Sequence, residues 1–190
     1  MLNWICRSLS FIVLKIFCRM QIKGSSFIPR QGPFILASNH LSNIDPVVMA
    51  AACPRRLNFL AKEELFRASL FGRFIYILGA FPIKRSKADI SALKVALKRL
   101  KREALLVFLE GTRDPKAKKV QPGVGFLVNR SGVPVVPARV YNTDKVLGPG
   151  RKFIKPHKIK VVFGKPLVFD KKKEPLEVAK EILARINTLK

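Results

Sequence analysis

The chain has 190 residues, which suffice for one well-filled hydrophobic core but not for two comfortable ones. A hydrophobic content of 48% excludes a disordered chain, although the formal net charge is +25, with 37 Lys and Arg residues against 12 Asp and Glu residues. This charge excess indicates an anionic partner and leaves three classes open: nucleic acid, an anionic membrane surface and a phosphorylated substrate.

The N-terminal segment from Trp4 to Met20 is apolar apart from a few polar residues, and three basic residues interrupt it, Arg7, Lys15 and Arg19. These charges fit neither a signal peptide nor a spanning helix, which needs about 20 nearly uncharged residues. At about 100° per residue they share one narrow stripe with Ser8. We therefore predict that residues 1–21 form an amphipathic helix in the membrane interface, with Arg and Lys at headgroup level. A helix packed on the protein's own core is the alternative, but it leaves the width of the apolar face unexplained.

Short apolar runs alternate with helical patterns along the rest of the chain. Strands are predicted at Phe34–Ser38, Leu57–Ala61, Ala80–Lys84, Ala104–Leu109, Val133–Val140 and Ile159–Phe163. Helices are predicted from Asp45, over Leu65–Leu78 and Ser91–Arg102, from Val124, and over Leu176–Leu189. This alternation is typical of an α/β domain, here over residues 22–190. We expect a single mixed, largely parallel sheet with helices on both faces, preceded by the N-terminal membrane-interface helix.

Polar residues follow the ends of four predicted strands. His40 follows the first strand, Lys62 the second, Arg85 the third, and Glu110 to Arg113 the fourth. In open α/β sheets the ligand site lies at the carboxyl ends of the strands. A candidate base, three cations and a carboxylate at this edge indicate a site for an anionic substrate with an activated hydroxyl or carbonyl group.

His40 and Asp45 are the candidate catalytic pair, although their spacing alone is a weak signal. Asp45 precedes Pro46, and this dipeptide is also an ordinary helix start, with Asp at the N-cap and Pro at the first helical position. The two interpretations are compatible, because a carboxylate at the start of a helix can accept the ring N–H of a preceding histidine. That bond fixes the tautomer and leaves the other ring nitrogen to take a proton. The chain has no Gly-x-Ser-x-Gly elbow, so a covalent serine is disfavoured.

Four blocks resemble, in order, the signatures of the glycerolipid acyltransferase family that includes 1-acylglycerol-3-phosphate O-acyltransferase. They are Asn39 with His40-x4-Asp45, GAFPIKR ending at Arg85, FLEGTR over residues 108–113, and VPVVP over residues 133–137. The segment FLAKEEL around Lys62 is similar to the family segment that carries a basic residue for the phosphate. The resemblance covers about residues 22–163. Leu109 departs from the usual Pro of the third block, and we expect it to point away from the chemistry.

The resemblance implies an acyltransferase domain over residues 22–190 that moves a fatty acyl chain from acyl-CoA or acyl-carrier protein to the free sn-2 hydroxyl of 1-acylglycerol-3-phosphate, giving phosphatidate. His40 would deprotonate that hydroxyl and Asp45 would orient His40, with direct attack and no acyl-enzyme. The phosphate would be held by Lys62, Arg85 and Arg113. The polar wall around the glycerol portion would comprise Glu110, Gly111 and Thr112. No metal or cofactor is required.

The implied partners are a lysophospholipid, acyl-CoA or acyl-carrier protein, and an anionic membrane surface at the cytoplasmic face of the cell membrane. The enzyme would be peripheral or monotopic. The Phe-rich segment 65–81 is either a second apolar membrane contact or ordinary core. Acyl transfer to glycerol-3-phosphate or to another lysolipid remains an alternative. A basic nucleic-acid-binding protein is a distant alternative, because stacking aromatic residues do not alternate with Lys and Arg; we expect no nucleic acid partner.

Overall fold

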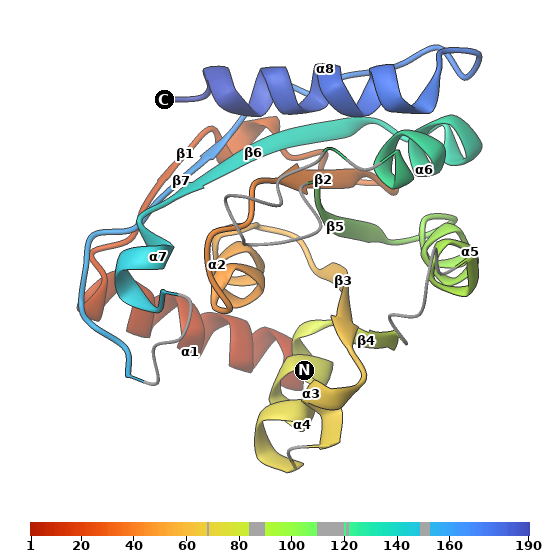
Figure 1. Ribbon diagram of the computed structural model, residues 1–190. Coiled ribbons are helices and arrows are strands. Elements are labelled where there is room, and N and C mark those ends of the chain that lie inside the picture. Colours follow the sequence, from red (N-terminus) through yellow and green to blue (C-terminus); the bar gives the residue numbers. More distant parts are fainter. Residues whose placement is uncertain (68, 84–89, 110–119, 121, 149–152) are drawn as a thin grey trace.

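A seven-stranded sheet forms the centre of the described chain, in the order β1-β7-β6-β2-β5-β3-β4 (Figure 1). The structure is a computed structural model that describes residues 1–67, 69–83, 90–109, 120, 122–148 and 153–190. The strands are β1 (Gln21–Lys23), β2 (Ile35–Ser38), β3 (Leu57–Lys62), β4 (Ala80–Ile83), β5 (Ala104–Phe108), β6 (Val135–Tyr141) and β7 (Lys160–Phe163). Only the β6–β7 pair is antiparallel among them. The prediction of a mixed, largely parallel sheet is confirmed.

Helices cover both faces of this sheet, as the sequence predicts. They are α1 (Leu2–Phe17), η1 (Ser25–Phe27), α2 (Asp45–Ala52), α3 (Glu64–Arg67), α4 (Ser69–Leu78), α5 (Ile90–Arg99), α6 (Gly123–Ser131), α7 (Thr143–Val146) and α8 (Pro175–Thr188). One core cluster lies between the sheet and α1, α2 and α4, and the other lies against α5, α6 and α8 (Figure 1). Strand β2 serves both clusters, because Leu36 faces the first and Ile35 and Ala37 face the second.

Several short elements were not predicted. Strand β1 has only three residues, too few for a periodic pattern, and it crosses the expected boundary between residues 21 and 22. Helix α7 has only four residues, and the predicted helix over Leu65–Leu78 is divided into α3 and α4. The C-terminal helix begins at Pro175, where the Glu174 side chain accepts a hydrogen bond from the Glu177 backbone N–H.

Helix α1 combines features of both alternatives that the sequence left open. Its inner face packs on the domain, with Leu14 buried in the first core cluster and the Asn3 side chain donating to the Ile77 carbonyl of α4. Its opposite face is exposed and apolar; we call this the outer α1 face, formed by Leu2, Ile5, Leu9, Ile12, Val13 and Ile16. No helix in the described ranges is long and apolar enough to cross a bilayer.

The side chain of Arg7, predicted to lie at headgroup level, is directed to the end of α2. Its Nε donates to the Ala50 carbonyl at 3.0 Å, and its Nη2 donates to the Cys53 carbonyl. The last carbonyls of a helix have no intrahelical partner, so the end of α2 attracts the guanidinium of the neighbouring helix. Sequence periodicity identifies a polar stripe, but it does not reveal these acceptors on another element.

Candidate active site

His40 lies at the carboxyl edge of the central parallel strands, two residues beyond the end of β2. The preceding residue, Asn39, anchors this position. Its amide donates to the Val140 carbonyl at 3.0 Å and its side-chain oxygen accepts from the Val140 N–H at 2.8 Å. These two bonds continue the β2–β6 contact beyond the last paired residues. The backbone that carries His40 is therefore fixed to a neighbouring strand.

The His40 ring is held by Asp45, the first residue of α2. The distance from His40 Nδ1 to Asp45 Oδ2 is 2.8 Å, and the Asp45 side chain is fully buried whereas that of His40 is 16% exposed. A carboxylate only accepts hydrogen bonds, so Nδ1 carries the hydrogen and Nε2 is left as a proton acceptor. The geometry predicted for this pair is present.

Asp45 does not act as the helix cap that we also considered. Helix α2 begins at Asp45 itself, with Ile44 at the N-cap position and no side-chain cap hydrogen bond. The carboxylate instead turns back to the preceding loop, where Oδ2 also accepts from the Leu41 N–H at 2.6 Å and the Ser42 N–H at 2.8 Å. Three N–H groups donate to this one oxygen, and these hydrogen bonds take the place of a cap interaction with the first turn of α2. The carboxylate thus fixes the loop and the imidazole together.

Phe108 provides a second contact to the imidazole that the sequence did not reveal. Its ring stacks on His40 with centroids 4.2 Å apart and an interplanar angle of 19°. Strands β2 and β5 pair in register, with Ser38 opposite Phe108, so the two strand ends bring the rings together. The sequence contained this phenylalanine in the block FLEGTR, but only the strand order shows which strand end it adjoins.

The serines beside His40 have structural partners. Ser42 is buried, and its hydroxyl donates to the Leu147 carbonyl and accepts from the Ile44 N–H. Ser38 is also buried, and its hydroxyl lies 3.4 Å from the Asn39 side-chain oxygen. Neither is bonded to His40 among the contacts of the described chain.

A model of one protein family, described as Acyltransferase, matches residues 19–141, more than half of the chain. The chain belongs to this acyltransferase family. The match begins within the turn after α1 and ends with β6, so it includes the His40–Asp45 pair and all five strands of the parallel run β6-β2-β5-β3-β4 through the centre of the sheet.

Individual relatives agree with the family assignment. The 1-acyl-sn-glycerol-3-phosphate acyltransferase of Bacillus subtilis is 25% identical over 164 residues, covering 85% of this chain and 80% of the relative. The enzyme of the same name from Streptococcus pneumoniae is 32% identical over 166 residues, with 85% of this chain and 61% of the relative covered. The chain thus spans less than two thirds of that second relative.

A solved structure shows the same fold. The crystal structure of the 1-acyl-sn-glycerophosphate acyltransferase PlsC from Thermotoga maritima superposes with a TM-score of 0.71 and 25% identity, covering 94% of this chain and 78% of that one. These similarities confirm the expected family, the fold class and the enzyme class, an O-acyltransferase.

Most of the predicted substrate-binding residues of this acyltransferase lie outside the described ranges: Arg85 and Arg113, predicted for the phosphate, and Glu110, Gly111 and Thr112, predicted for the polar wall. Lys62 is the last residue of β3, where its backbone pairs with Ile83 of β4. In the strand order β2-β5-β3, the end of β3 is two strands from β2, roughly 10 Å at the usual strand spacing. Strand β3, and Lys62 with it, therefore ends at the same edge of the sheet as His40.

Leu109, which replaces the usual Pro of the third block, points away from the face of the sheet that carries His40 and Phe108. It is buried in the cluster formed with α5, α6 and α8, away from the face that carries α2. Its N–H donates to the Ser38 carbonyl at 3.2 Å, a bond that proline lacks the hydrogen to make. The substitution therefore adds a contact between the ends of β2 and β5. Among the described side chains, no group of three or more His, Cys, Asp or Glu could hold a metal ion.

Proposed function

We propose that this acyltransferase esterifies the sn-2 hydroxyl of 1-acylglycerol-3-phosphate with a fatty acyl chain from acyl-CoA or acyl-carrier protein, giving phosphatidate. The observation that carries the proposal is the His40–Asp45 pair, 2.8 Å apart at the carboxyl edge of the sheet. The names of the relatives support the acceptor. The chain's excess of 25 positive charges suits a phosphorylated lipid.

The proposed reaction proceeds in one displacement. The acceptor hydroxyl gives its proton to His40 Nε2 while its oxygen attacks the thioester carbonyl carbon. Asp45 stabilises the imidazolium that forms, because the carboxylate already accepts the Nδ1 hydrogen. The C–S bond then breaks, and the leaving thiolate takes the proton from Nε2. Phe108 limits rotation of the ring during both transfers. We assign Lys62, Arg85 and Arg113 to the substrate phosphate, and Glu110, Gly111 and Thr112 to the surrounding polar wall, by family resemblance.

An acceptor panel tests this proposal. Purified protein is offered 1-acylglycerol-3-phosphate, glycerol-3-phosphate and 1-acylglycerophosphocholine, each with acyl-CoA and with acyl-carrier protein. We expect 1-acylglycerol-3-phosphate to give the highest kcat/KM. Its phosphate monoester can bind the proposed cations, and its acyl chain can hold it at the membrane surface. A preference for either other acceptor would contradict the proposed substrate, and failure with both donors would contradict the proposed reaction.

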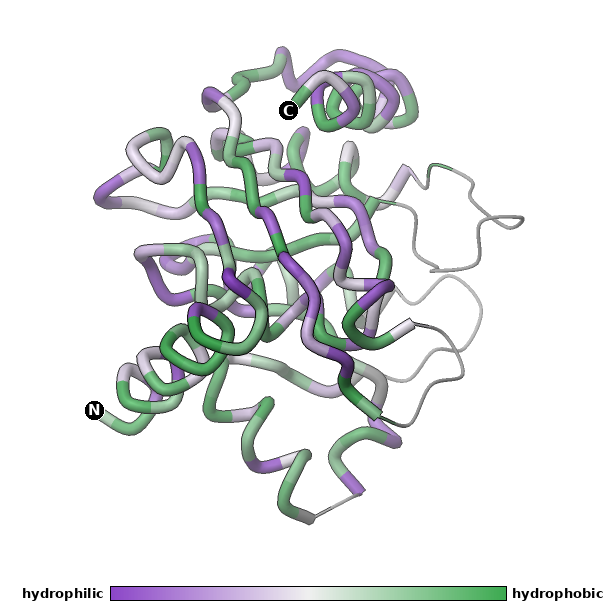
Figure 2. The backbone as a smooth tube through the Cα atoms, turned by 90° about the vertical axis from the view of Figure 1, so that its left-hand side faces the viewer, coloured by the Kyte–Doolittle hydropathy of each residue, from purple (hydrophilic) through white to green (hydrophobic). Residues whose placement is uncertain are grey.

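We further propose that the enzyme is peripheral, on the cytoplasmic face of the membrane, through the outer α1 face. The six apolar side chains of this face are exposed, and the hydropathy colours of Figure 2 show that the helix at the N-terminus is largely hydrophobic. Helix α4 packs beside α1 and exposes Leu70 and Phe71, so the Phe-rich segment adds apolar surface next to it. Apolar side chains on the exposed face of a helix stabilise the membrane-bound state when they insert into the headgroup region. Both candidate donors are soluble carriers that reach the site from the cytoplasm.

The change Leu9→Glu tests this orientation. Leu9 is 60% exposed in the middle of the outer α1 face, and burying a leucine contributes about 1.5–3 kcal/mol. We expect the variant to partition onto anionic vesicles at least about tenfold more weakly, measured by flotation, with an unchanged circular dichroism spectrum. Val168→Glu is the matched control, because Val168 is an exposed apolar residue outside the helices that flank the first core cluster. An equal loss of vesicle binding in both variants would show that an added negative charge weakens binding wherever it lies. That result would contradict the assignment of the outer α1 face to the membrane.

A further inference from the structure

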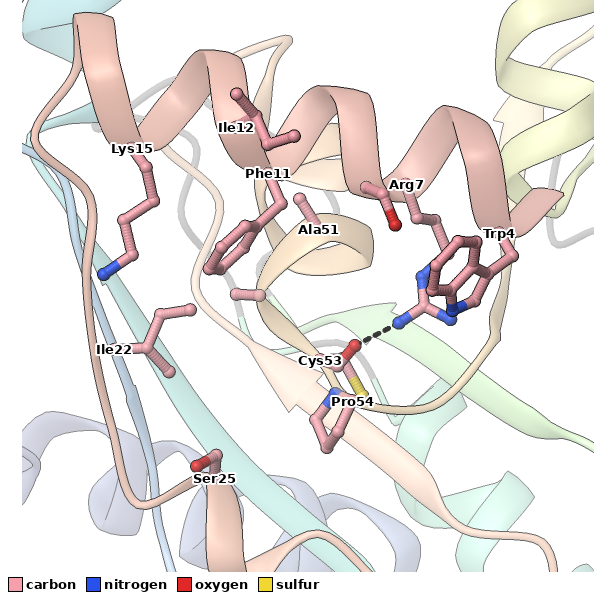
Figure 3. Close-up of a pocket in the computed structure, with 12 residues that line it drawn as sticks. Trp4, Arg7, Phe11, Ile12, Lys15, Ile22, Ser25, Ala51, Cys53 and Pro54 are labelled. Carbon is pink, nitrogen blue, oxygen red and sulfur yellow. Dashed lines mark hydrogen bonds between the residues drawn. The ribbon is translucent and has the colours of Figure 1, made fainter. Parts of the chain in front are cut away.

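A groove of about 570 Å³ lies between α1 and the segment that ends α2 (Figure 3). Its walls include Phe11 and Ile12 of α1, Ile22 of β1, and Ala51 and Cys53 at the end of α2. Its size is in the range of small-molecule sites, roughly 300–1,000 Å³. Asp45 and Cys53 lie at opposite ends of α2, about 12 Å apart along the helix axis. The groove is therefore separate from the proposed catalytic site.

Two cations line this apolar groove, one near each end. Arg7 and Lys15 are eight residues apart on α1, or about 12 Å along its axis, and Figure 3 shows both side chains directed to the groove side of the helix. The Lys15 ammonium lies 5.6 Å from the centre of the Phe11 ring. Within the described ranges, no carboxylate pairs with either cation. The groove therefore carries positive charge without a compensating acid.

Arg7, which lines the groove, keeps one guanidinium nitrogen without a described acceptor. Its Nε and Nη2 bind carbonyls at the end of α2, and no described residue accepts from Nη1. Burial is the main cause that lowers the pKa of Arg7, and the charge of Arg56 lowers it further. An anionic or carbonyl oxygen in the groove would offset both effects, because it accepts a hydrogen bond from the guanidinium and reduces the local positive potential.

We propose that this groove binds one anionic glycerophospholipid of the membrane as a non-substrate ligand. Its phosphate contacts Lys15, its ester carbonyl oxygens face Arg7, and its glycerol and first acyl carbons lie on Phe11. The separation of the two cations favours such an extended amphiphile over a free phosphate ion, which cannot contact both. Ile12 belongs to both the groove wall and the outer α1 face, so a lipid can enter from the bilayer. This inference rests on the proposed membrane location of α1.

The chain contains a built-in reporter for this groove. Trp4 is its single tryptophan, and it lies among the groove residues beside Arg7 (Figure 3). The full-length protein is titrated with dihexanoyl phosphatidylglycerol below its micelle concentration, and Trp4 emission is recorded. Dihexanoyl phosphatidylcholine has the same chains without net charge, and inorganic phosphate has the charge without the chains. No acyl donor is present, so the signal reports binding without turnover.

We expect saturable binding of the phosphatidylglycerol, and binding of the phosphatidylcholine at least about fivefold weaker, since one Lys or Arg contact near anionic lipid contributes about that factor. Lys15→Ala should weaken the phosphatidylglycerol binding about fivefold. Lys180→Ala on the distant helix α8 removes the same charge from an exposed position and should leave it unchanged. Equal binding of the two lipids, equal effects of the two variants, or the same emission change with inorganic phosphate would overturn the proposal. Acyl transfer is measured separately, so a negative result here is distinguishable from failure of the proposed reaction.

Discussion

The His40→Ala variant is expected to lose acyl transfer, with kcat reduced by about 10²–10⁴, because a positioned general base contributes a factor of this size. Alanine removes the ring nitrogen that would accept the hydroxyl proton, and the only other histidine of the chain, His157, is exposed in the segment between α7 and β7. The measurement is the initial rate of phosphatidate formation at saturating 1-acylglycerol-3-phosphate. Vesicle binding should stay unchanged, because the outer α1 face is intact.

His157→Ala is the matched control for this experiment. His157 is exposed, in the segment between α7 and β7, and it does not line the groove. We expect the control to keep the wild-type rate. A His40→Ala rate within a factor of about ten of wild type would contradict the role of general base, since the expected contribution is at least about a hundredfold.

The fold could be predicted from the sequence because the central strands are buried on both faces of the sheet. Continuous apolar runs such as Ile35–Ala37 have no solvent face, which is typical of a parallel sheet covered by helices. The polar residues that interrupt such runs then mark the strand ends, and therefore the site. His40 and Asp45 could be paired from sequence, because their geometry depends on one strand end and the next helix start.

The remaining features depend on contacts between segments that are distant in sequence. Phe108 stacks on His40 only because β5 lies beside β2, and Asn39 binds Val140 only because β6 lies on the other side. The polar stripe of α1 was visible from periodicity, but the inward direction of Arg7 follows from free carbonyls at the end of α2. Local patterns identify elements and their faces, whereas strand order decides which faces meet.

A comparison of Asp45→Asn with Asp45→Ala separates the charge of the carboxylate from its hydrogen bonds. Asp45 Oδ1 has no hydrogen-bond partner among the described residues, whereas Oδ2 accepts from His40, Leu41 and Ser42. In the Asn variant, the two backbone N–H groups require an oxygen at the Oδ2 position. The amide oxygen therefore stays there, and the amide nitrogen takes the place of Oδ1. The histidine tautomer is preserved while the negative charge is lost.

We expect the two variants to differ in both activity and stability. Asp45→Asn should reduce kcat about tenfold, because a hydrogen bond to a neutral oxygen is roughly half as strong as one to a carboxylate. Asp45→Ala should reduce kcat nearly as far as His40→Ala, because the hydrogen bond at Nδ1 that fixes the tautomer and orientation of the ring is then lost.

The stability difference has its own cause. Asp45→Ala leaves the N–H groups of Leu41 and Ser42 without their acceptor, and each unsatisfied buried donor costs about 1–3 kcal/mol. For a protein of this size, 1 kcal/mol corresponds to about 2–4 °C in Tm, so the Ala variant should melt several degrees below the Asn variant. Calorimetry and initial rates on the same preparations test both expectations. A wild-type rate for Asp45→Asn would show that the charge is irrelevant and that Asp45 acts only through the shape of the loop, whereas equal rates for the two variants would show that the hydrogen bonds kept by asparagine contribute nothing to the rate.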